Sequence, residues 1–512
     1  MSDPTSPDAV SASGEPVADG IRRRSLRRII AICFGVGVVL GVVIGVTVSV
    51  SSQSDDDVAK LSWTALEDGL EEARLTVPVD HSDPDGKTLE LRIVRRPAAD
   101  PAARIGSLLV NPGGPGFGAE VMVANTAGLL KPEILRHFDV VGMDPRGTGK
   151  SVPAIDCIDS ADDLIATVDI SPQDDTARQE QATVTNSFAK GCLERTGDAI
   201  AHMSTASTAR DLDLLRRALG EDTISYFGVS YGCGLGATWA TLFPETVRAA
   251  VLDGCEDPTA DGFEAARQQA TGFQRSVEAF LEKCESAGSE CPIGKDRAPI
   301  EDLRELWVRA ASGEVAGLPG RPALNEWMLQ TAINVAMYSE DFWPIFAEAI
   351  ASGLQGDGSI LMQLADAYLQ RRDDGTWGNE IEAFTVIGCM DDPTRPSAQE
   401  TESLFAELSS IAPLVYPQGF FSAPVCEELP TPGDSPVTIT GSGTPTLLVI
   451  GNTGDPATPF ASTERMAAAL ESSVLVAVKS NDHGGYGIND CINDTVHRYL
   501  IDGVAPSAGT TC

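Results

Sequence analysis

Basic residues are scarce in this sequence. Lys and Arg number 37 against 74 Asp and Glu, which gives a formal net charge of −37 at pH 7. A protein that binds nucleic acid needs Lys and Arg to neutralise phosphates, so this balance argues against a nucleic-acid partner. The excess of carboxylates is typical of a solvated acidic surface that keeps a protein dispersed in a salty exterior.

Metal-binding cysteine motifs are also missing. No Cys-x-x-Cys pair and no close cluster of Cys and His occurs, so a zinc site is not expected. Ten of the 11 cysteines remain when Cys33 is set aside, and an even number in an exported chain indicates disulfides. The sequence alone leaves their pairing open, and proximity along the chain suggests Cys157–Cys192, Cys233–Cys255, Cys284–Cys291, Cys389–Cys426 and Cys491–Cys512.

The N-terminal region predicts export. Residues 29–50 contain no charged side chain and are long enough to cross a bilayer as a helix. Arginines precede this run and three aspartates follow it, which places the N-terminus in the cytoplasm and the bulk of the chain outside. We therefore expect a disordered cytoplasmic tail at 1–28, a transmembrane signal anchor at 29–50 and a polar linker at 51–60. The alternative is a signal peptide cleaved near Ser49 or Ser51, which would leave the protein secreted.

Beyond residue 61, short strands alternate with helices. Half-exposed strands are expected at 75–79 and 89–93, and continuous apolar runs predict strands buried on both faces. This alternation predicts an α/β fold whose mostly parallel central sheet carries helices on both faces. The buried strands are expected at 107–111, 138–143, 223–229, 249–252, 446–450 and 474–478, and the helices at 205–219, 232–243, 459–471 and 489–501.

One long region breaks this alternation. Between the strands ending near 253 and starting near 445 the chain has amphipathic helical stretches, such as 264–284 and 324–351. A structureless loop of that length is implausible in a compact domain. We predict an inserted helical cap at 258–440, between core segments at 61–257 and 441–512.

A candidate nucleophile lies at the end of the strand at 223–229. Residues 228–232 read Gly-Val-Ser-Tyr-Gly, between a predicted strand and a predicted helix. That context is the one required for a nucleophile elbow, in which the serine sits on a tight, strained turn. The sequence therefore predicts Ser230 as a nucleophile, and the simpler interpretation is a glycine-rich turn without chemistry.

A serine hydroxyl needs a base, and histidines are few. Of the five histidines only His483 and His497 follow Ser230, as the order serine, acid, histidine of this arrangement requires. His483 lies in a glycine-rich loop after a predicted strand, whereas His497 falls in the terminal helix and is expected at the surface. We predict His483 as the base.

The acid should follow a strand between the serine and the histidine. Asp455 directly follows the apolar run 447–450, where a carboxylate can orient the imidazole and stabilise its charged form. Asp455 could instead cap a turn before Pro456. Asp482 is a weaker candidate because it adjoins His483 and would rarely point at its ring.

Acyl transfer also needs donors for the developing oxyanion. One donor is expected to be the backbone N–H of Tyr231, and the other to come from the loop 111–116, with Gly114 preferred and Gly113 in reserve. The alternative for this loop is a structural turn. Asp144 and Arg146 are expected to be structural, with an Arg–carboxylate pair holding their loop.

Four motifs together resemble a known family. Residues 111–116, 144–149 with Ser151, 228–232 and 454–459 are similar to those of bacterial tripeptidyl aminopeptidase-like hydrolases, relatives of the prolyl aminopeptidases. The resemblance extends from about 61 to 512. It implies an exported serine exopeptidase of the α/β-hydrolase fold that releases short N-terminal peptides, with a helical cap, no cofactor and Ser230, Asp455 and His483 as the triad.

Three details depart from the family pattern and leave substrate preference open: Asn111-Pro112 replaces the His-Gly of prolyl aminopeptidases, Cys233 follows the elbow, and Asp482 precedes His483. An aminopeptidase needs an acidic anchor for the substrate amine, for which Glu256, Asp257 or a cap carboxylate are candidates. The expected partners are peptide substrates and, through the N-terminal helix, the membrane. An esterase or lipase with the same triad and an inactive surface binding protein are the alternatives.

Overall fold

The structure is a computed structural model that describes residues 60–512 except 126–127, 169, 171–174, 373 and 416–421. The expected tail and anchor at 1–50 and the linker up to residue 59 lie outside the described residues. Among the helices that are described, none is long and apolar enough to cross a membrane.

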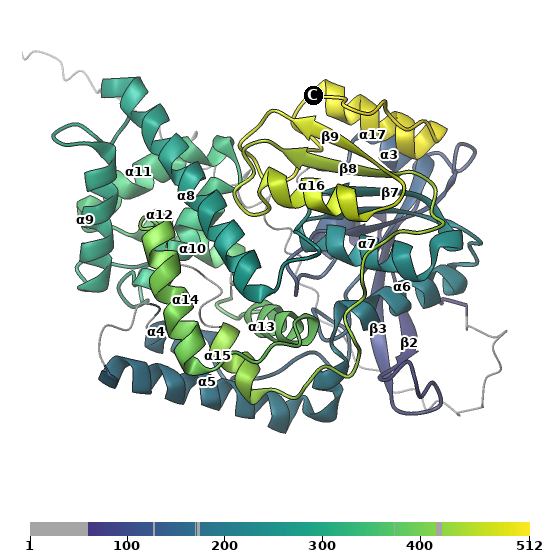
Figure 1. The fold of residues 1–512 in the computed structure, drawn as a ribbon, viewed down its shortest axis with the longest axis horizontal. Helices are drawn as coiled ribbons and strands as arrows, with labels where there is room; N and C mark the ends of the chain where they lie inside the picture. Colours follow the sequence, from purple (N-terminus) through teal and green to yellow (C-terminus); the bar gives the residue numbers. More distant parts are fainter. Residues whose placement is uncertain (1–59, 126–127, 169, 171–174, 373, 416–421) are drawn as a thin grey trace, which may run out of the picture.

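The described residues form one nine-stranded sheet with the order β1-β2-β3-β5-β4-β6-β7-β8-β9 (Figure 1). The pairs β1/β2, β2/β3 and β3/β5 are antiparallel, and every other neighbouring pair is parallel. The strands are β1 (Thr64–Ala65), β2 (Glu71–Pro78), β3 (Thr88–Arg96), β4 (Gly106–Asn111), β5 (Phe138–Met143), β6 (Ile224–Val229), β7 (Val247–Asp253), β8 (Leu447–Asn452) and β9 (Ser473–Val478).

The burial of each strand follows its sequence pattern. Every residue of β4, β5 and β8 is buried, as expected of continuous apolar runs in the middle of a sheet. In β2 buried and exposed residues alternate, and Leu75 lies opposite Leu91 of β3 in an antiparallel register. The strands predicted from the sequence are therefore confirmed, including the antiparallel pair at the edge.

Helices cover both faces of the sheet. On one face α6, α7 and α16 pack on side chains such as Leu109, and on the other α2, α3 and α17 pack on side chains such as Leu108. This is the α/β-hydrolase fold. The helices are α2 (Glu120–Ala124), α3 (Pro132–His137), α4 (Ala161–Thr167), α5 (Asp175–Arg195), α6 (Thr205–Leu219), α7 (Tyr231–Leu242), α8 (Gly262–Ala287), α9 (Pro299–Ala311), α10 (Glu326–Met337), α11 (Trp343–Leu354), α12 (Ser359–Tyr368), α13 (Glu380–Asp391), α14 (Ala398–Ile411), α15 (Ser422–Glu428), α16 (Phe460–Ala469) and α17 (Asp490–Asp502), with short 3₁₀ helices η1 (Glu67–Gly69), η2 (Gly197–His202), η3 (Pro244–Thr246), η4 (Gly288–Glu290) and η5 (Glu340–Phe342).

A separate layer of helices lies beside the sheet (Figure 1). It contains α8 to α15, which the chain inserts between β7 and β8. α8 to α12 and α14 share an apolar core of their own, whereas the buried side chains of α13 and α15 pack with the core of the sheet. The stretch 324–351 forms two helices, α10 and α11, because the chain turns at η5 before Pro344 begins the second. Ile165 of α4 belongs to the same core, and its carbonyl accepts a hydrogen bond from Asn325 Nδ2 (2.7 Å). The cap at 258–440 stays a prediction as a domain, and α4 from the first core segment packs with it.

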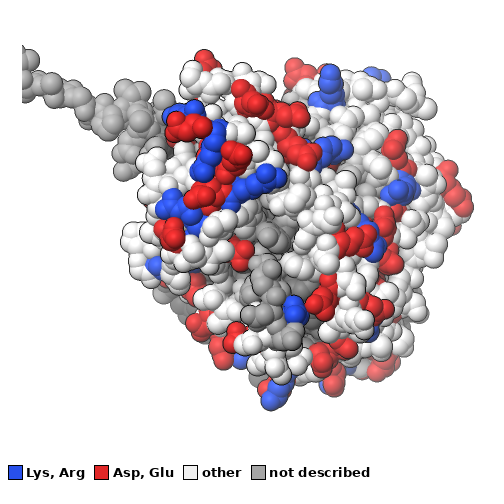
Figure 2. Space-filling view, turned by 60° about the vertical axis from the view of Figure 1, so that its left-hand side comes forward, with Lys and Arg blue, Asp and Glu red and all other residues white. Residues whose placement is uncertain are grey.

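Charged side chains are mixed on the surface. On the face shown in Figure 2, Lys and Arg side chains are interspersed with Asp and Glu. The ion pairs of the described surface include Arg267 with Glu407 and Lys283 with Glu340, all with partly or fully exposed side chains. Pairs of this kind contribute about 0–1 kcal/mol each, so they matter more for solubility than for stability.

Five disulfides link the described cysteines, and they are the five pairs that proximity along the chain suggested. Four of them, all but Cys491–Cys512, join cysteines that are buried or nearly so, and Cys233–Cys255 joins the first turn of α7 to the residues after β7. Disulfides persist in oxidising compartments, so the pairs indicate an extracytoplasmic location.

Reduction should destabilise the protein. A disulfide typically stabilises a folded protein by about 2–4 kcal/mol, mainly because it restricts the unfolded chain. We expect the melting temperature to fall clearly in reductant, measured by circular dichroism and compared with the oxidised, alkylated protein. An unchanged melting temperature together with free thiols at these ten positions would contradict the disulfide assignment.

Candidate active site

Ser230 lies on a sharp turn between β6 and α7. Its φ of 58° and ψ of −128° belong to a region that residues other than glycine rarely adopt. A Cβ on Gly228 would overlap the carbonyl oxygen of Gly232, and a Cβ on Gly232 would lie 2.7 Å from the carbonyl oxygen of Asn111. The two glycines therefore allow backbone segments on either side of the turn to approach each other closely. The Ser230 N–H donates to the Asp253 carbonyl (2.9 Å), and this hydrogen bond stabilises the turn.

His483 and Asp455 form a hydrogen-bonded pair. His483 Nδ1 lies 2.9 Å from Asp455 Oδ1 and 3.0 Å from Oδ2, and the Asp455 side chain is fully buried. The N–H groups of Ala457 and Thr458 donate to Asp455 Oδ1 (3.0 and 2.8 Å). The carboxylate therefore caps its own turn and also holds the imidazole, so the two interpretations of Asp455 from the sequence are compatible.

The environment of His483 favours a charged imidazole. Burial alone would lower its pKa, but the charge and hydrogen bond of Asp455, together with the charges of Asp253 and Glu256, raise the pKa above its usual value. Because Nδ1 donates to Asp455, Nε2 keeps the lone pair that can accept a proton. The Tyr338 ring stacks on the imidazole with centroids 5.2 Å apart, and the Tyr338 carbonyl accepts the His483 N–H (2.9 Å), so the helical layer helps to hold the ring.

The two rejected candidates lie elsewhere. His497 Nε2 hydrogen-bonds the Tyr486 hydroxyl (2.9 Å) on the sheet face covered by α2, α3 and α17. Its side chain is partly buried, so the expected surface position was wrong. Asp482 Oδ1 accepts the backbone N–H of Glu340 (2.9 Å). Neither group is among those that hold the imidazole of His483.

The glycine-rich loop after β4 lies directly against the nucleophile. A Cβ on Gly113 would be 2.9 Å from Ser230 Cβ. The Gly113 N–H donates to Asn111 Oδ1 (2.9 Å) and is therefore occupied, which leaves Gly114 as the better donor in this loop. Tyr231 is the first residue of α7, where a backbone N–H has no acceptor within the helix. Gly114, Ser230 and Tyr231 line one cavity, and the role of the two N–H groups as oxyanion donors stays a prediction.

The loop at 144–149 is held by two buried carboxylates. Arg146 donates to both oxygens of Asp211 in α6 (2.8 and 2.7 Å), and both side chains are fully buried. Asp144 instead accepts the N–H groups of Ala119 (3.1 Å) and Lys150 (3.0 Å). The expected Arg–carboxylate pair is present, with Asp211 as its acid, and Asp144 ties the loop to the residues after the oxyanion loop.

Sequence reasoning missed three residues that support the loop of His483. The Asp253 carboxylate accepts the N–H groups of Gly485 (2.7 Å) and Tyr486 (2.9 Å), and burial raises its pKa to about 6. Asn452 Nδ2 donates to the carbonyls that flank His483. Asp253 and Asn452 are the last residues of the parallel strands β7 and β8. A polar residue at the end of an apolar run in the sequence could have pointed to both of them. Tyr338 comes from the inserted helices, and nothing in the sequence marked it.

A cavity of about 610 Å³ opens beside the nucleophile. Ser230, Gly234 and Thr238 lie along one face of α7 and line it, so it follows two helical turns, or about 11 Å. Glu256 and Asp391 also line it. Burial raises the pKa of each to about 7, and for Glu256 the nearby Asp391 charge adds to the effect. No lysine or arginine is among the described residues that line this cavity.

Comparisons with known proteins agree on one family. Residues 413–512 match the family model described as TAP-like protein. The chain is 32% identical to "Serine protease Hip1" of Mycobacterium tuberculosis over 86% of each chain. It is 34% identical to "Carboxylesterase B" of the same organism over 86% of each chain. It is 30% identical to "Tripeptidyl aminopeptidase" of Streptomyces lividans, over 86% of this chain and 82% of that one.

Proposed function

The chain belongs to the TAP-like family of α/β-hydrolases, and from this premise we propose that it is a serine exopeptidase that releases short peptides from the free N-terminus of its substrates. Two of the three relatives named above are a serine protease and a tripeptidyl aminopeptidase. The hydrogen-bonded His483–Asp455 pair and the strained Ser230 turn support acyl-enzyme chemistry.

In the proposed reaction Ser230 Oγ attacks the scissile carbonyl carbon while His483 Nε2 takes the hydroxyl proton. The negative charge on the carbonyl oxygen is stabilised by the N–H groups of Tyr231 and Gly114. His483 then gives the proton to the leaving amine as the C–N bond breaks, and Asp455 stabilises the imidazolium throughout. Water, activated by the same imidazole, attacks the acyl-enzyme and frees Ser230.

The cavity along α7 carries the proposal of an exopeptidase. Its two helical turns span about 11 Å, and three extended residues span about 10 Å, so an N-terminal tripeptide fits between Ser230 and the far end. Glu256 and Asp391 line the cavity, no lysine or arginine does among the described residues, and such carboxylates complement an ammonium group. An esterase would use the same triad but would gain nothing from these carboxylates.

Glu256 is the best candidate for the amine anchor. It makes no hydrogen bond or ion pair with another described residue, and its carboxylate lies so close to α7 that a Cβ on Gly234 would overlap Oε1. Asp257 is already engaged, because Arg465 and Gln268 both donate to Oδ2 (3.0 Å each). Asp391 accepts the N–H of Thr205 (2.6 Å) and its hydroxyl (2.7 Å), so it is engaged as well, and its charge acts on Glu256.

Glu256→Gln should therefore separate peptides from esters. We expect kcat/KM for tripeptide amides with a free amine to fall by about 100-fold, since an unpaired ammonium costs about 3 kcal/mol. Turnover of short acyl esters should change little. Steady-state rates on both substrate classes, with the exposed Glu428→Ala as the control variant, measure the difference.

The pH dependence of kcat/KM should also reveal Glu256 as the anchor of the substrate amine. Below about pH 7 the Glu256 carboxyl takes up a proton and loses its charge, and above about pH 8 the substrate amine loses its own. We expect kcat/KM for free-amine peptides to peak between these values, and esters to lack the alkaline decline. A wild-type preference for esters, with no cleavage of free-amine peptides, would contradict the proposed function.

We also propose where the enzyme works. The disulfides favour an extracytoplasmic catalytic part, and the uncharged run at 29–50 favours a membrane anchor. Separation of membrane and soluble fractions tests this. The full chain should stay with the membranes, and a chain without residues 1–59 should not. If the full chain is expressed and a product shortened at its N-terminus is recovered in the soluble fraction, the N-terminal segment is cleaved instead.

A further inference from the structure

A segment without helix or strand, residues 429–446, leads from α15 back to β8 (Figure 1). We call these residues the strap. Five of its side chains line the cavity beside Ser230, and among them only Asp434 is charged: Asp434, Ser435, Pro436, Val437 and Ile439. The strap therefore forms a wall of the proposed peptide site.

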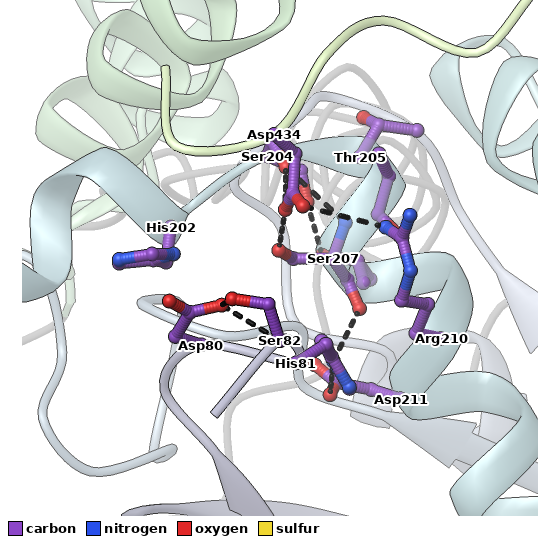
Figure 3. Close-up of polar contacts among 12 residues, drawn as sticks. Asp80, His81, Ser82, His202, Ser204, Thr205, Ser207, Arg210, Asp211 and Asp434 are labelled. Atoms are coloured by element: carbon purple, nitrogen blue, oxygen red, sulfur yellow. Dashed lines mark hydrogen bonds and ion pairs between the residues drawn. The ribbon is translucent and has the colours of Figure 1, made fainter. Parts of the chain in front are cut away.

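The first fastening of the strap is at the start of α6. The Asp434 carboxylate accepts hydrogen bonds from Ser204 Oγ (3.3 Å) and from Ser207 Oγ, and it lies 3.7 Å from Arg210 Nη1 (Figure 3). The positive end of the helix favours a carboxylate at this place. The neighbouring Gly433 N–H donates to the Ala201 carbonyl (2.7 Å).

The second fastening is on α7. The N–H groups of Thr440 and Gly441 donate to the hydroxyl of Thr241 (3.2 and 3.1 Å). Between the two fastenings, residues 435–439 form no hydrogen bond with any other described residue. Ile439 packs against the apolar core on the sheet face that carries α7, so the position of the wall depends on this apolar contact and on the hydrogen bonds at its two ends.

The second fastening places its end of the wall at the far end of the cavity. Thr238 is the last residue of α7 that lines the cavity, and Thr241 lies less than one turn further along the helix. The strap consequently crosses the cavity about two helical turns from Ser230. Val437 and Ile439 of the strap line the cavity with apolar side chains, and its only charged lining residue, Asp434, is already hydrogen-bonded at the start of α6.

We propose that residues 435–439 are the end wall that limits the length of the released peptide, and that Asp434 is the positioning residue that holds this wall. The proposal rests on the proposed function, because it concerns the same cavity. Removal of the Asp434 carboxylate leaves the Gly433 N–H bond to the Ala201 carbonyl as the remaining hydrogen bond of the first fastening. The end of the wall near α6 can then move outward, and the cavity accepts additional residues between the bound N-terminus and Ser230.

The test compares peptides that carry a reporter after two, three, four or five residues from a free amine. For the wild type we expect one preferred length. In Asp434→Ala the ratio of kcat/KM for the next longer substrate to that for the preferred one should rise at least 10-fold. Asp434→Asn keeps the shape of the side chain and should show a smaller rise in this ratio. Thr241→Val removes the hydroxyl that holds the other end of the wall and should also raise the ratio.

Two controls keep the outcome clear. Glu428→Ala removes an exposed carboxylate just before the strap and should leave the length profile unchanged. Melting temperatures show whether each variant is folded. An unchanged length profile in folded Asp434→Ala and folded Thr241→Val would overturn the proposal.

A series of esters with acyl chains of increasing length separates this proposal from the proposed function. If the wild type cleaves no peptide but hydrolyses esters, the exopeptidase function is wrong, and the end wall is then judged by acyl length alone. A longer acyl limit in Asp434→Ala would support the wall, and an identical limit would contradict it.

Discussion

Ser230→Ala is expected to lower kcat by about 10⁶-fold, because the attacking oxygen is lost and the remaining residues of a triad have little to act on without it. The fold should survive, since the Ser230 hydroxyl has no structural partner among the described residues, whereas its backbone N–H still donates to Asp253. Steady-state kinetics on a free-amine tripeptide amide measure the loss.

A fluorophosphonate probe gives the matching control. It should label Ser230 in the wild type and fail to label the variant, while circular dichroism and the melting temperature stay the same. Residual activity within 100-fold of the wild type would mean that another group performs the attack, and that the turn between β6 and α7 has a structural role only.

Asp455→Asn is expected to lower kcat by about 10⁴-fold, because an amide favours the wrong tautomer of the imidazole. Burial lowers the pKa of His483, and Asp455 contributes most to raising it, together with the charges of Asp253 and Glu256. Catalysis needs a neutral imidazole, so the raised pKa puts the acid limb of the wild-type pH profile above about pH 6.5. The variant should have its acid limb at lower pH, and a titration of kcat against pH measures the shift.

Asp482→Asn is the matched control for this variant. Asp482 adjoins His483, but its carboxylate accepts the Glu340 N–H instead of facing the ring. It should keep most of the wild-type rate and an unmoved acid limb. Equal losses in the two variants would contradict Asp455 as the acid of the triad.

Local sequence patterns predicted most of the core. Runs such as 107–111 and 138–143 are buried strands because their apolar residues are continuous, and α6 ends at Leu219 because Gly220 takes the left-handed conformation. The order of motifs along the chain also led to Asp455 and His483, which the structure brings into contact.

Contacts between residues far apart in the chain could not be predicted from the sequence. Arg146 pairs with Asp211, 65 residues away, and no local pattern announces such a partner. Tyr338 and Asp391 reach the site from α10 and α13 only because the inserted helices fold back over the sheet. The strap carries no regular period at all, so its place in the cavity depends on contacts that only the folded chain reveals.

The proposed enzyme cuts peptides close to a free N-terminus. The most direct test of this activity is a digest of a mixed peptide library, half of it acetylated at the N-terminus, with the products identified by mass spectrometry. We expect short N-terminal fragments, about three residues long, from the free-amine half alone. Cleavage of the acetylated half at similar rates, or cuts in the interior of the peptides, would contradict it.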